Sequence, residues 1–508
     1  MFDPASGGFE TTAAVGAYRL YIGTNAGQAN INTTANPDGS NTITGDSNAN
    51  IVDGGGGTDT INGGLGDDVL NGGLGNDSVT GGGGKDTFLW NIDAIGAQTD
   101  NYTLGVGEDE IVEIHSPLAA NTITFSSNQF ITSGDDTLNL FGNSSTYTVN
   151  IYGGSGIDTI TASNITIGSA VTNFYGGGDN DSLTGSGGSR MSLWGGEGND
   201  TLKTGSSSPN NGLNMIGGNG DDTYVLTNTF VFINENAGEG TADRVQTALS
   251  YALIDVSFVN IEFLETTDAT STAAINLIGN RFAQTITGNA GDNQLNGGLG
   301  VDTLIGGKGN DAYYLNDVGL DGRVIDTIVE LANQGIDGVR TSVTVNLNEA
   351  RYANVENGYL TGTAAINLGG AAANNVLIGN DGANLIAGLG GRDIMRGGLG
   401  VDTFKYFFNT DTGKTALTRD LIQDFTHLTD KIDISAMDAN GALAGDGTFV
   451  FQAVKDTAFT GVAGQLHYLT SGANTLIEGD FNGDGVADFQ IELTGNIATL
   501  TGGTDIIL

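Results

Sequence analysis

The chain has 508 residues and a formal net charge of −42, because 59 acidic residues outnumber 17 lysines and arginines. This acidity argues against nucleic acid as a partner. Cysteine is absent, which excludes disulfides and thiolate metal sites, and 84 glycines with only 4 prolines indicate a turn-rich chain.

The N-terminal segment, residues 1–44, is polar and rich in Thr, Asn and Ala. We interpret it as a cap or an anchoring segment. It lacks a basic stretch followed by an apolar stretch, so no Sec signal peptide is predicted. Apolar runs long enough for a membrane-spanning helix are also absent from the sequence, so export would need another route.

Four nine-residue units follow one another from Gly54 to Leu89. Each has glycine at positions 1, 2 and 4, aspartate at position 6 and an apolar residue at position 8. Glycine tolerates the positive φ that a sharp turn needs, and position 8 of the short strand points inward. Two units make one coil of a parallel β-roll, so the stacked turns offer carboxylates and carbonyls to calcium. The sequence therefore predicts a first roll over 45–90 that is disordered when calcium is scarce.

The segment 91–150 departs from this pattern and contains strand-like runs, so we interpret it as a β-rich insert. In the next segment, 151–225, glycine pairs begin at Gly153, Gly176, Gly195 and Gly217. Their steps of 23, 19 and 22 residues predict wider solenoid coils, each with one glycine–aspartate turn. Aromatic residues recur beside these turns, and we interpret them as core or stacking residues: Tyr152, Tyr175 and Trp194.

A module is then duplicated at a distance of 91 residues. It predicts a spacer over 226–278 with a second roll over 279–314, and a spacer over 315–369 with a third roll over 370–405. The early coils of both rolls carry an amide at position 6, namely Gln284, Asn293, Asn375 and Asn384. Amides can hydrogen-bond without a cation, so we expect calcium mainly in the later turns.

These repeats resemble the RTX (haemolysin-type) calcium-binding β-roll superfamily over about two-thirds of the chain. The last segment, 406–508, contains DLIQDFTHLTDKIDISAMDAN, AFTGVAGQLHY and DFNGDGVADFQIEL, which are similar to the C-terminal domain of serralysin-type metalloproteases. The resemblance implies a C-terminal β domain with a type I secretion signal. It also implies export through a type I secretion apparatus to the exterior or cell surface of a Gram-negative bacterium.

We predict multiple calcium ions, held by the position-6 aspartates Asp59, Asp68, Asp77, Asp86, Asp158, Asp181, Asp200, Asp222, Asp302, Asp311, Asp393 and Asp402. A separate D-x-N-G-D-G-x-x-D run resembles a shortened EF-hand loop, with Asp480, Asn482, Asp484 and Asp488 as ligands. The alternative for this run is an Asx-rich turn held by its own hydrogen bonds.

Four acids of the terminal segment, Asp420, Asp424, Asp430 and Asp433, are interpreted as a solvated set that flanks strands. Asp424 is also placed to reach the last turn of the third roll. For His467, beside Tyr468, we expect a place on the surface of the terminal domain.

Catalytic motifs are missing from the sequence. The histidines His115, His427 and His467 stand alone, so no HExxH zinc site exists, and neither GxSxG nor a cysteine nucleophile occurs. We therefore predict that the protein is not an enzyme.

The predicted fold class is all-β, a parallel β-roll or β-solenoid of several stacked segments with β-rich spacers and a C-terminal β domain. We expect a secreted structural protein that folds on calcium and self-associates into sheets or filaments, as a surface-layer or extracellular matrix component. A cell-surface polysaccharide is a further expected partner. The alternatives are a polysaccharide-active enzyme, with its activity in 91–150 or 224–278, and an adhesin built on the same solenoid.

Overall fold

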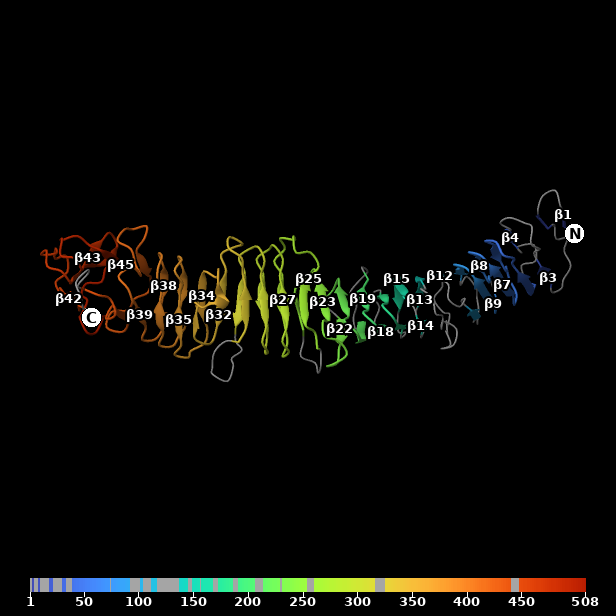
Figure 1. Ribbon diagram of the computed structural model, residues 1–508, viewed down its shortest axis with the longest axis horizontal. Coiled ribbons are helices and arrows are strands. Elements are labelled where there is room, and N and C mark those ends of the chain that lie inside the picture. The colour runs from blue at the N-terminus through green and yellow to red at the C-terminus, as the bar shows by residue number, and fades with distance from the viewer. Residues whose placement is uncertain are drawn as a thin grey trace. The chain divides into compact units, whose positions relative to one another are not determined.

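The computed structural model describes residues 2–3, 8–9, 18–21, 30–32, 39–73, 75–91, 101–103, 111–116, 137–144, 149–155, 157–167, 172–185, 191–205, 213–228, 231–253, 260–315, 325–439 and 447–508. Two compact units make up the chain. Unit 1 comprises 1–249 and 255–263, and unit 2 comprises 250–254 and 264–508. The predicted all-β fold is confirmed, because the described residues form parallel sheets of short strands and contain no α-helix (Figure 1). Among these residues, no helix has the length and apolar character to cross a membrane.

In unit 1, strands that alternate along the chain build two faces of a solenoid. One face consists of β3 (Tyr18–Tyr21), β5 (Asn41–Thr44), β7 (Thr60–Leu65), β9 (Ser78–Gly83) and β11 (Asn101–Thr103). The opposite face consists of β4 (Asn30–Asn32), β6 (Ile51–Asp53), β8 (Val69–Asn71), β10 (Thr87–Asn91), β12 (Ile111–Ser116), β13 (Thr137–Ser144), β15 (Thr159–Ile167), β17 (Ser182–Gly185), β19 (Thr201–Thr204), β21 (Thr223–Leu226) and β23 (Arg244–Thr247). A further sheet contains β14 (Val149–Ser155), β16 (Thr172–Gly178), β18 (Met191–Glu197), β20 (Leu213–Asn219) and β22 (Val231–Asn234). The first two strands, β1 (Phe2–Asp3) and β2 (Gly8–Phe9), pair antiparallel.

The register of these strands follows from the nonapeptide. Ile61 pairs with Val79 on one face and Leu70 with Phe88 on the other, so each coil is two units long. All four side chains are at most 1% exposed, because position 8 faces the interior and stacks on its equivalent in the next coil. This parallel stacking is the one expected from the sequence.

The wider coils of unit 1 also follow the predicted steps. Ile160 pairs with Leu183, Phe174 with Leu193, and Leu202 with Tyr224, at separations of 23, 19 and 22 residues. The aromatic residues occupy one line, because Tyr152 is in register with Tyr175, and Tyr175 with Trp194. The rings of Tyr175 and Trp194 stack with centroids 5.9 Å apart, which confirms their role as stacking residues.

Unit 2 repeats the solenoid with three runs of parallel strands. The first run is β24 (Tyr251–Ala252), β26 (Asn276–Ile278), β28 (Gln294–Asn296), β30 (Ala312–Leu315), β32 (Gly338–Thr341), β34 (Asn357–Leu360), β36 (Val376–Ile378), β38 (Ile394–Arg396) and β40 (Asp420–Ile422). The second is β27 (Thr285–Thr287), β29 (Thr303–Ile305) and β31 (Thr327–Val329), and β25 (Phe263–Thr266) begins at the unit boundary. The third is β33 (Val345–Asn346), β35 (Asn367–Gly369), β37 (Leu385–Ala387), β39 (Thr403–Lys405), β41 (Lys431–Asp433) and β46 (Ile506–Ile507). A single 3₁₀ turn, η1 (Ala350–Tyr352), occurs in the described residues of this unit.

The terminal segment extends the solenoid and then reverses direction. After β42 (Val450–Phe451), an antiparallel meander forms from β43 (Gln465–Ser471), β44 (Asn474–Asp480) and β45 (Phe489–Leu493). Strand β45 pairs parallel with β40, where Leu421 is in register with Glu492. The meander thereby covers the last coil of this sheet with its own strands. Of the predicted cap 1–44 and insert 91–150, the structure describes only the strands given above and residues 39–44.

Candidate calcium sites

Aspartates at position 6 form ladders along the turns. The Oδ1 atom of each accepts a hydrogen bond from the backbone N–H of the residue that occupies position 6 in the preceding coil. Asp77 accepts from Asp59 at 2.8 Å, Asp200 from Asp181 at 2.7 Å and Asp402 from Asn384 at 2.8 Å. The position-6 aspartates predicted from the sequence are all between 0 and 2% exposed. One oxygen of each carboxylate therefore has a structural role in joining coils.

The second oxygen of these carboxylates has a different environment. The Oδ2 atom is buried and makes no hydrogen bond in Asp59, Asp68, Asp181, Asp200, Asp222, Asp311, Asp393 and Asp402. It lies beside the first glycine of its own repeat. At Gly195, the place of a missing Cβ is occupied by Asp200 Oδ2 and by the carbonyl oxygen of Gly217 in the next coil. Carboxylate and carbonyl oxygens thus converge at a point that only glycine leaves open, and this is a donor set that suits Ca²⁺.

Burial makes these carboxylates hold their protons when no cation is bound. Desolvation raises the pKa of Asp59 and Asp200 to about 6, of Asp68 and Asp311 to about 7, and of Asp181 to about 8. The backbone N–H groups that donate to Oδ1 act in the opposite direction but do not compensate. A divalent cation at Oδ2 would supply the missing opposite charge and favour the ionised form. The residues present therefore fit calcium.

The loop after β44 is arranged differently. Both carboxylate oxygens of Asp480 accept hydrogen bonds. Gly483 N–H donates to Oδ1 at 2.6 Å, and Gly485 N–H donates to Oδ2 at 2.9 Å. Asn482 accepts from Asp484 N–H, and Asp484 accepts from Val486 N–H, each at 2.8 Å. Asp488 accepts from Phe481 N–H and from the Asn482 amide. These contacts are those of the Asx-rich turn, and calcium binding at Asp480, Asn482, Asp484 and Asp488 stays a prediction.

The amide-bearing coils close their turns without a cation. Asn293 Oδ1 accepts from Asn289 N–H at 2.8 Å, and Asn293 Nδ2 donates to Asn289 Oδ1 at 3.0 Å. Asn384 and Asn380 make the same two contacts, at 2.8 and 3.0 Å. The amides thus hydrogen-bond as expected. Gln284, Asn293 and Asn384 each pair with an amide of their own turn, whereas Asn375 accepts from Ala371 N–H and donates to the Glu356 carbonyl.

Comparison with known proteins identifies these turns. A profile of the RTX calcium-binding nonapeptide repeat (four copies) matches residues 38–70, 62–89, 192–208, 278–313 and 369–404. The chain carries RTX repeats. These RTX repeats bind Ca²⁺, and proteins that contain them are typically secreted by Gram-negative bacteria.

Two individual proteins are similar to parts of this chain. Metallopeptidase AprA of Pseudomonas marginalis is 38% identical over 178 residues, which are 32% of this chain and 35% of that protein. The chain therefore spans about a third of the length of this curated relative. The solution structure of the AlgE6R2 subunit from the Azotobacter vinelandii mannuronan C5-epimerase has 29% sequence identity, with a TM-score of 0.23, and covers 30% of this chain and 86% of that one.

Several acids that sequence reasoning missed extend the RTX ladders. Each is buried, and its Oδ1 accepts from the position-6 N–H of the coil before: Asp243, Asp326, Asp337, Asp420 and Asp430. None is preceded by the GGxGx run of the nonapeptide, which is why that pattern does not find them. The signal that remains is the end of the repeat, an aspartate two residues before a buried aliphatic residue, as in Asp337–Gly338–Val339.

The interpretation of the terminal acids as a solvated set was wrong for two of them. Asp420 is 0% and Asp430 is 2% exposed, because β40, which begins at Asp420, and β41, which follows Asp430, are stacked coils of the solenoid. Asp424 does reach the last RTX turn, where its two oxygens accept from Gly397 N–H at 2.9 Å and Gly398 N–H at 3.0 Å. Asp433 pairs with Lys405 at 2.8 Å.

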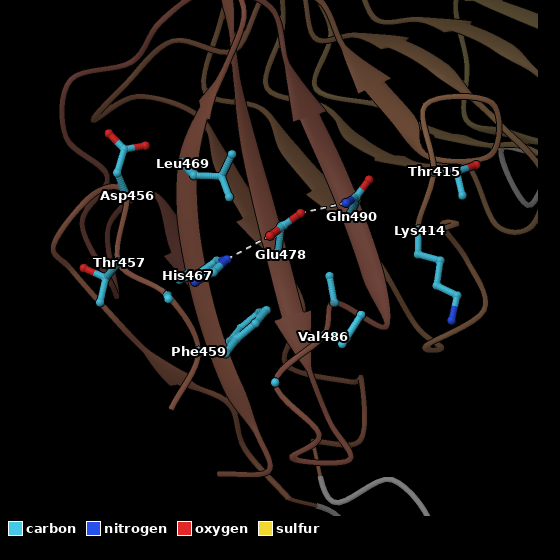
Figure 2. Close-up of a pocket in the computed structure, with 13 residues that line it drawn as sticks. Lys414, Thr415, Asp456, Thr457, Phe459, His467, Leu469, Glu478, Val486 and Gln490 are labelled. Atoms are coloured by element: carbon cyan, nitrogen blue, oxygen red, sulfur yellow. Dashed lines mark hydrogen bonds and ion pairs between the residues drawn. The ribbon is translucent and has the colours of Figure 1, made fainter. Parts of the chain in front are cut away.

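A pocket opens on the terminal meander, away from the RTX turns (Figure 2). His467 on β43 lies 2.9 Å from Glu478 on β44 through its Nε2 atom, and Gln490 Nε2 donates to the other Glu478 oxygen at 2.6 Å. The His467 ring stacks on Phe459 with centroids 3.9 Å apart. His467 is only 3% exposed, so its expected surface position was wrong: the Phe459 segment covers it.

Proposed function

We propose that this chain is a secreted calcium-binding RTX protein with a structural, non-enzymatic role. It folds when it meets calcium outside the cell and self-assembles as a surface-layer or extracellular matrix component. Release through a type I secretion apparatus of a Gram-negative bacterium is part of the same proposal. Typical secretion of RTX proteins supports this location.

The observation that carries the structural role is the distribution of the RTX ladders. Buried position-6 carboxylates occur in unit 1 from Asp59 to Asp222 and in unit 2 from Asp302 to Asp402. Calcium binding is therefore not confined to a tail, and it governs folding along both units. If most of the chain is a calcium-dependent solenoid, the protein can assemble only where the calcium concentration is high.

Exposed aliphatic residues at the turns support self-association. The two GGLGVD turns of unit 2 expose Leu299 and Val301 at 60 and 62%, and Leu399 and Val401 at 67 and 50%. Aliphatic side chains in water gain free energy when another surface covers them. The turns thus combine an inner calcium-binding side with an outer apolar edge.

Assembly can be tested directly by electron microscopy and light scattering at millimolar calcium. We expect sheets or filaments, and we expect serine at Leu299, Val301, Leu399 and Val401 to reduce them while leaving the calcium-induced circular dichroism unchanged. Ile336→Ser is the matched control, since Ile336 is equally exposed at 63% but lies outside the RTX turns. Monodisperse monomers at high calcium would overturn the structural role.

A second candidate function is a polysaccharide-active enzyme or an adhesin on the same scaffold. The pocket of the terminal meander favours it, because the buried Nδ1 atom of His467 has no hydrogen-bond partner while Nε2 is oriented by Glu478. Incubation of the calcium-loaded protein with alginate or pectin tests this candidate. Turnover that His467→Ala abolishes would rank it above the structural role.

A further inference from the structure

Two clusters of three buried acids lie where an RTX block passes into a spacer. In unit 1 the cluster comprises Asp222, Glu235 and Asp243, and in unit 2 it comprises Asp311, Glu330 and Asp337. Within each cluster, one oxygen from each residue lies within 4.8 Å of the other two. Only the first residue of each cluster belongs to a nonapeptide, so the other two come from the spacer coil that follows.

In the unit 1 cluster, some carboxylate oxygens accept a hydrogen bond and others have no partner. Asp222 and Asp243 each use Oδ1 to accept a ladder hydrogen bond, at 2.7 and 2.8 Å, and Oδ2 of both is buried without a partner. Glu235 is 0% exposed and accepts from the Tyr224 hydroxyl with Oε2, while its Oε1 has no partner. Each acid of this cluster therefore has one buried carboxylate oxygen without a hydrogen-bond partner.

The unit 2 cluster shares this arrangement in two of its acids, Asp311 and Glu330. Glu330 is 6% exposed, accepts from the Tyr313 hydroxyl with Oε1 and leaves Oε2 without a partner. Asp311 Oδ2 is also unpartnered, and Asp337 Oδ1 accepts from Asp311 N–H at 2.7 Å. In the part of the chain that the structure describes, no ion pair links a cationic side chain to any acid of either cluster.

The residue type at position 8 of the nonapeptide differs at both clusters. In the preceding coils it is a buried leucine, as at Leu202 and Leu304, whereas the unit that contributes to each cluster has a buried tyrosine, Tyr224 or Tyr313. Its hydroxyl contacts the spacer glutamate. The first glycine of the same unit completes the wall, because a Cβ at Gly306 would meet Asp311 Oδ2, the Tyr313 hydroxyl and Glu330 Oε1.

We propose that these two clusters are calcium sites of a second kind, each made by one RTX aspartate and two acids of the following spacer. Three carboxylates, with a hydroxyl and backbone carbonyls nearby, form the hard-oxygen environment that Ca²⁺ prefers. The ion joins the last coil of a block to the spacer, and so it makes the spacer part of the calcium-dependent fold. This inference rests on the proposed function in one respect, which is that the chain folds with calcium.

The competing arrangement is a neutral cluster, in which the carboxyls stay protonated and hydrogen-bond to one another and to tyrosine. Glutamine distinguishes the two, because it keeps the shape and hydrogen bonds of a neutral glutamic acid but lacks the charge that a cation needs. A neutral cluster tolerates Glu235→Gln and Glu330→Gln. A calcium site loses its ion.

The experiment counts calcium bound to the full-length folded protein, by equilibrium dialysis and metal analysis. We expect Glu235→Gln and Glu330→Gln each to lower the count by one ion and the double variant to lower it by two. Glu349→Gln is the control, since its side chain is 42% exposed and lies outside the clusters. An unchanged count in the double variant would overturn this inference alone, whereas a wild-type protein that takes up no calcium would overturn the proposed function as well.

A second measurement keeps the test informative if the glutamine variants do not fold. Terbium replaces calcium in oxygen sites and emits when a nearby tyrosine is excited. Tyr224→Phe and Tyr313→Phe keep all the carboxylates, and each is expected to lower the tyrosine-sensitised emission of the terbium-loaded protein. Tyr314→Phe is the matched control, because Tyr314 follows Tyr313 but contacts Gln294 instead of the cluster. Equal emission from Tyr313→Phe and Tyr314→Phe would contradict a site at Tyr313.

Discussion

Unit 2 contains two kinds of coil with the same register and opposite ways of completing their turns. In three of the four coils with an amide at position 6, position 2 is also an amide, and Asn380 and Asn384 satisfy each other. In the coil of Asp402, position 2 is Gly398 at positive φ (+94°), and the Oδ2 atom of the aspartate is buried without a hydrogen-bond partner. The two kinds of coil therefore share a backbone register, but an aspartate turn leaves a buried oxygen that a cation would complete.

Among the changes that we predict, removal of calcium should alter the structure of the aspartate coils most. Chelation leaves the unpartnered oxygens of Asp393 and Asp402 buried and repelling their neighbours, so we expect circular dichroism to change from β-rich to disordered. Readdition of calcium should reverse the change. Hydrogen exchange at intermediate calcium should show slower exchange in the amide turns than in the aspartate turns. Spectra that stay unchanged during chelation would contradict the calcium dependence of the fold.

Acidity should partly replace calcium in the aspartate coils. The pKa of Asp68 is raised to about 7 and that of Asp200 to about 6 in the folded state, above the ordinary value of 3.8. Because the folded state binds more protons, its stability without calcium is fully present below about pH 4 and is lost as the pH rises through 6 to 7. We therefore expect chelated protein to be more β-rich at pH 5 than at pH 8. Calcium addition to the chelated protein at pH 5, where the folded carboxyls are protonated, should release protons, which an unbuffered titration measures.

A single methyl group should distinguish the cation side of a turn from its outer side. In Gly388→Ala, the new Cβ would lie 2.7 Å from Asp393 Cγ, whereas in Gly390→Ala the nearest atom lies 3.8 Å away. We expect the first change to destabilise the calcium-loaded fold by about 3 kcal/mol, since it overpacks the turn and displaces a ligand oxygen. The second change should cost less than about 1 kcal/mol. Denaturant unfolding in excess calcium measures both, and equal losses would contradict the proposed ligand position.

The smallest effect is expected in an amide turn. Asn380→Ala removes the acceptor of Gly382 N–H at 2.9 Å and of the Asn384 amide at 3.0 Å. We expect a loss of about 1.5 kcal/mol from these hydrogen bonds, with no change in the number of calcium ions bound. Asp402→Ala, in the coil stacked on it, should lower that number. If both variants bound fewer ions, the distinction between amide turns and calcium-binding aspartate turns would be contradicted.

The sequence predicts the periodic part of this molecule well, for a physical reason. Glycine at a positive φ, an aspartate and an inward aliphatic residue are local requirements, so Ile61 and Val79 can be placed in register from spacing alone. The ladder acids of the spacers were missed because their turns vary in length and only the aspartate and the buried aliphatic residue persist. Glu235 and Glu330 are harder still, since the fold brings them to Asp222 and Asp311 from turns without a repeat. The duplicated module offered one signal, because both copies carry these acids in the same order.

The ladder hydrogen bonds run in one direction along the chain. A coil that precedes an aspartate coil is completed by the carboxylate of that next coil, as Asp393 and Asp402 are by Asp420 and Asp430 in the terminal segment. Removing residues from the C-terminal end therefore strips a buried N–H group of its acceptor, whereas removing residues from the N-terminal end leaves a carboxylate that water can solvate. The two ends of the solenoid are chemically unequal. We therefore expect truncation at the C-terminal end to destabilise the neighbouring coil more than truncation at the N-terminal end.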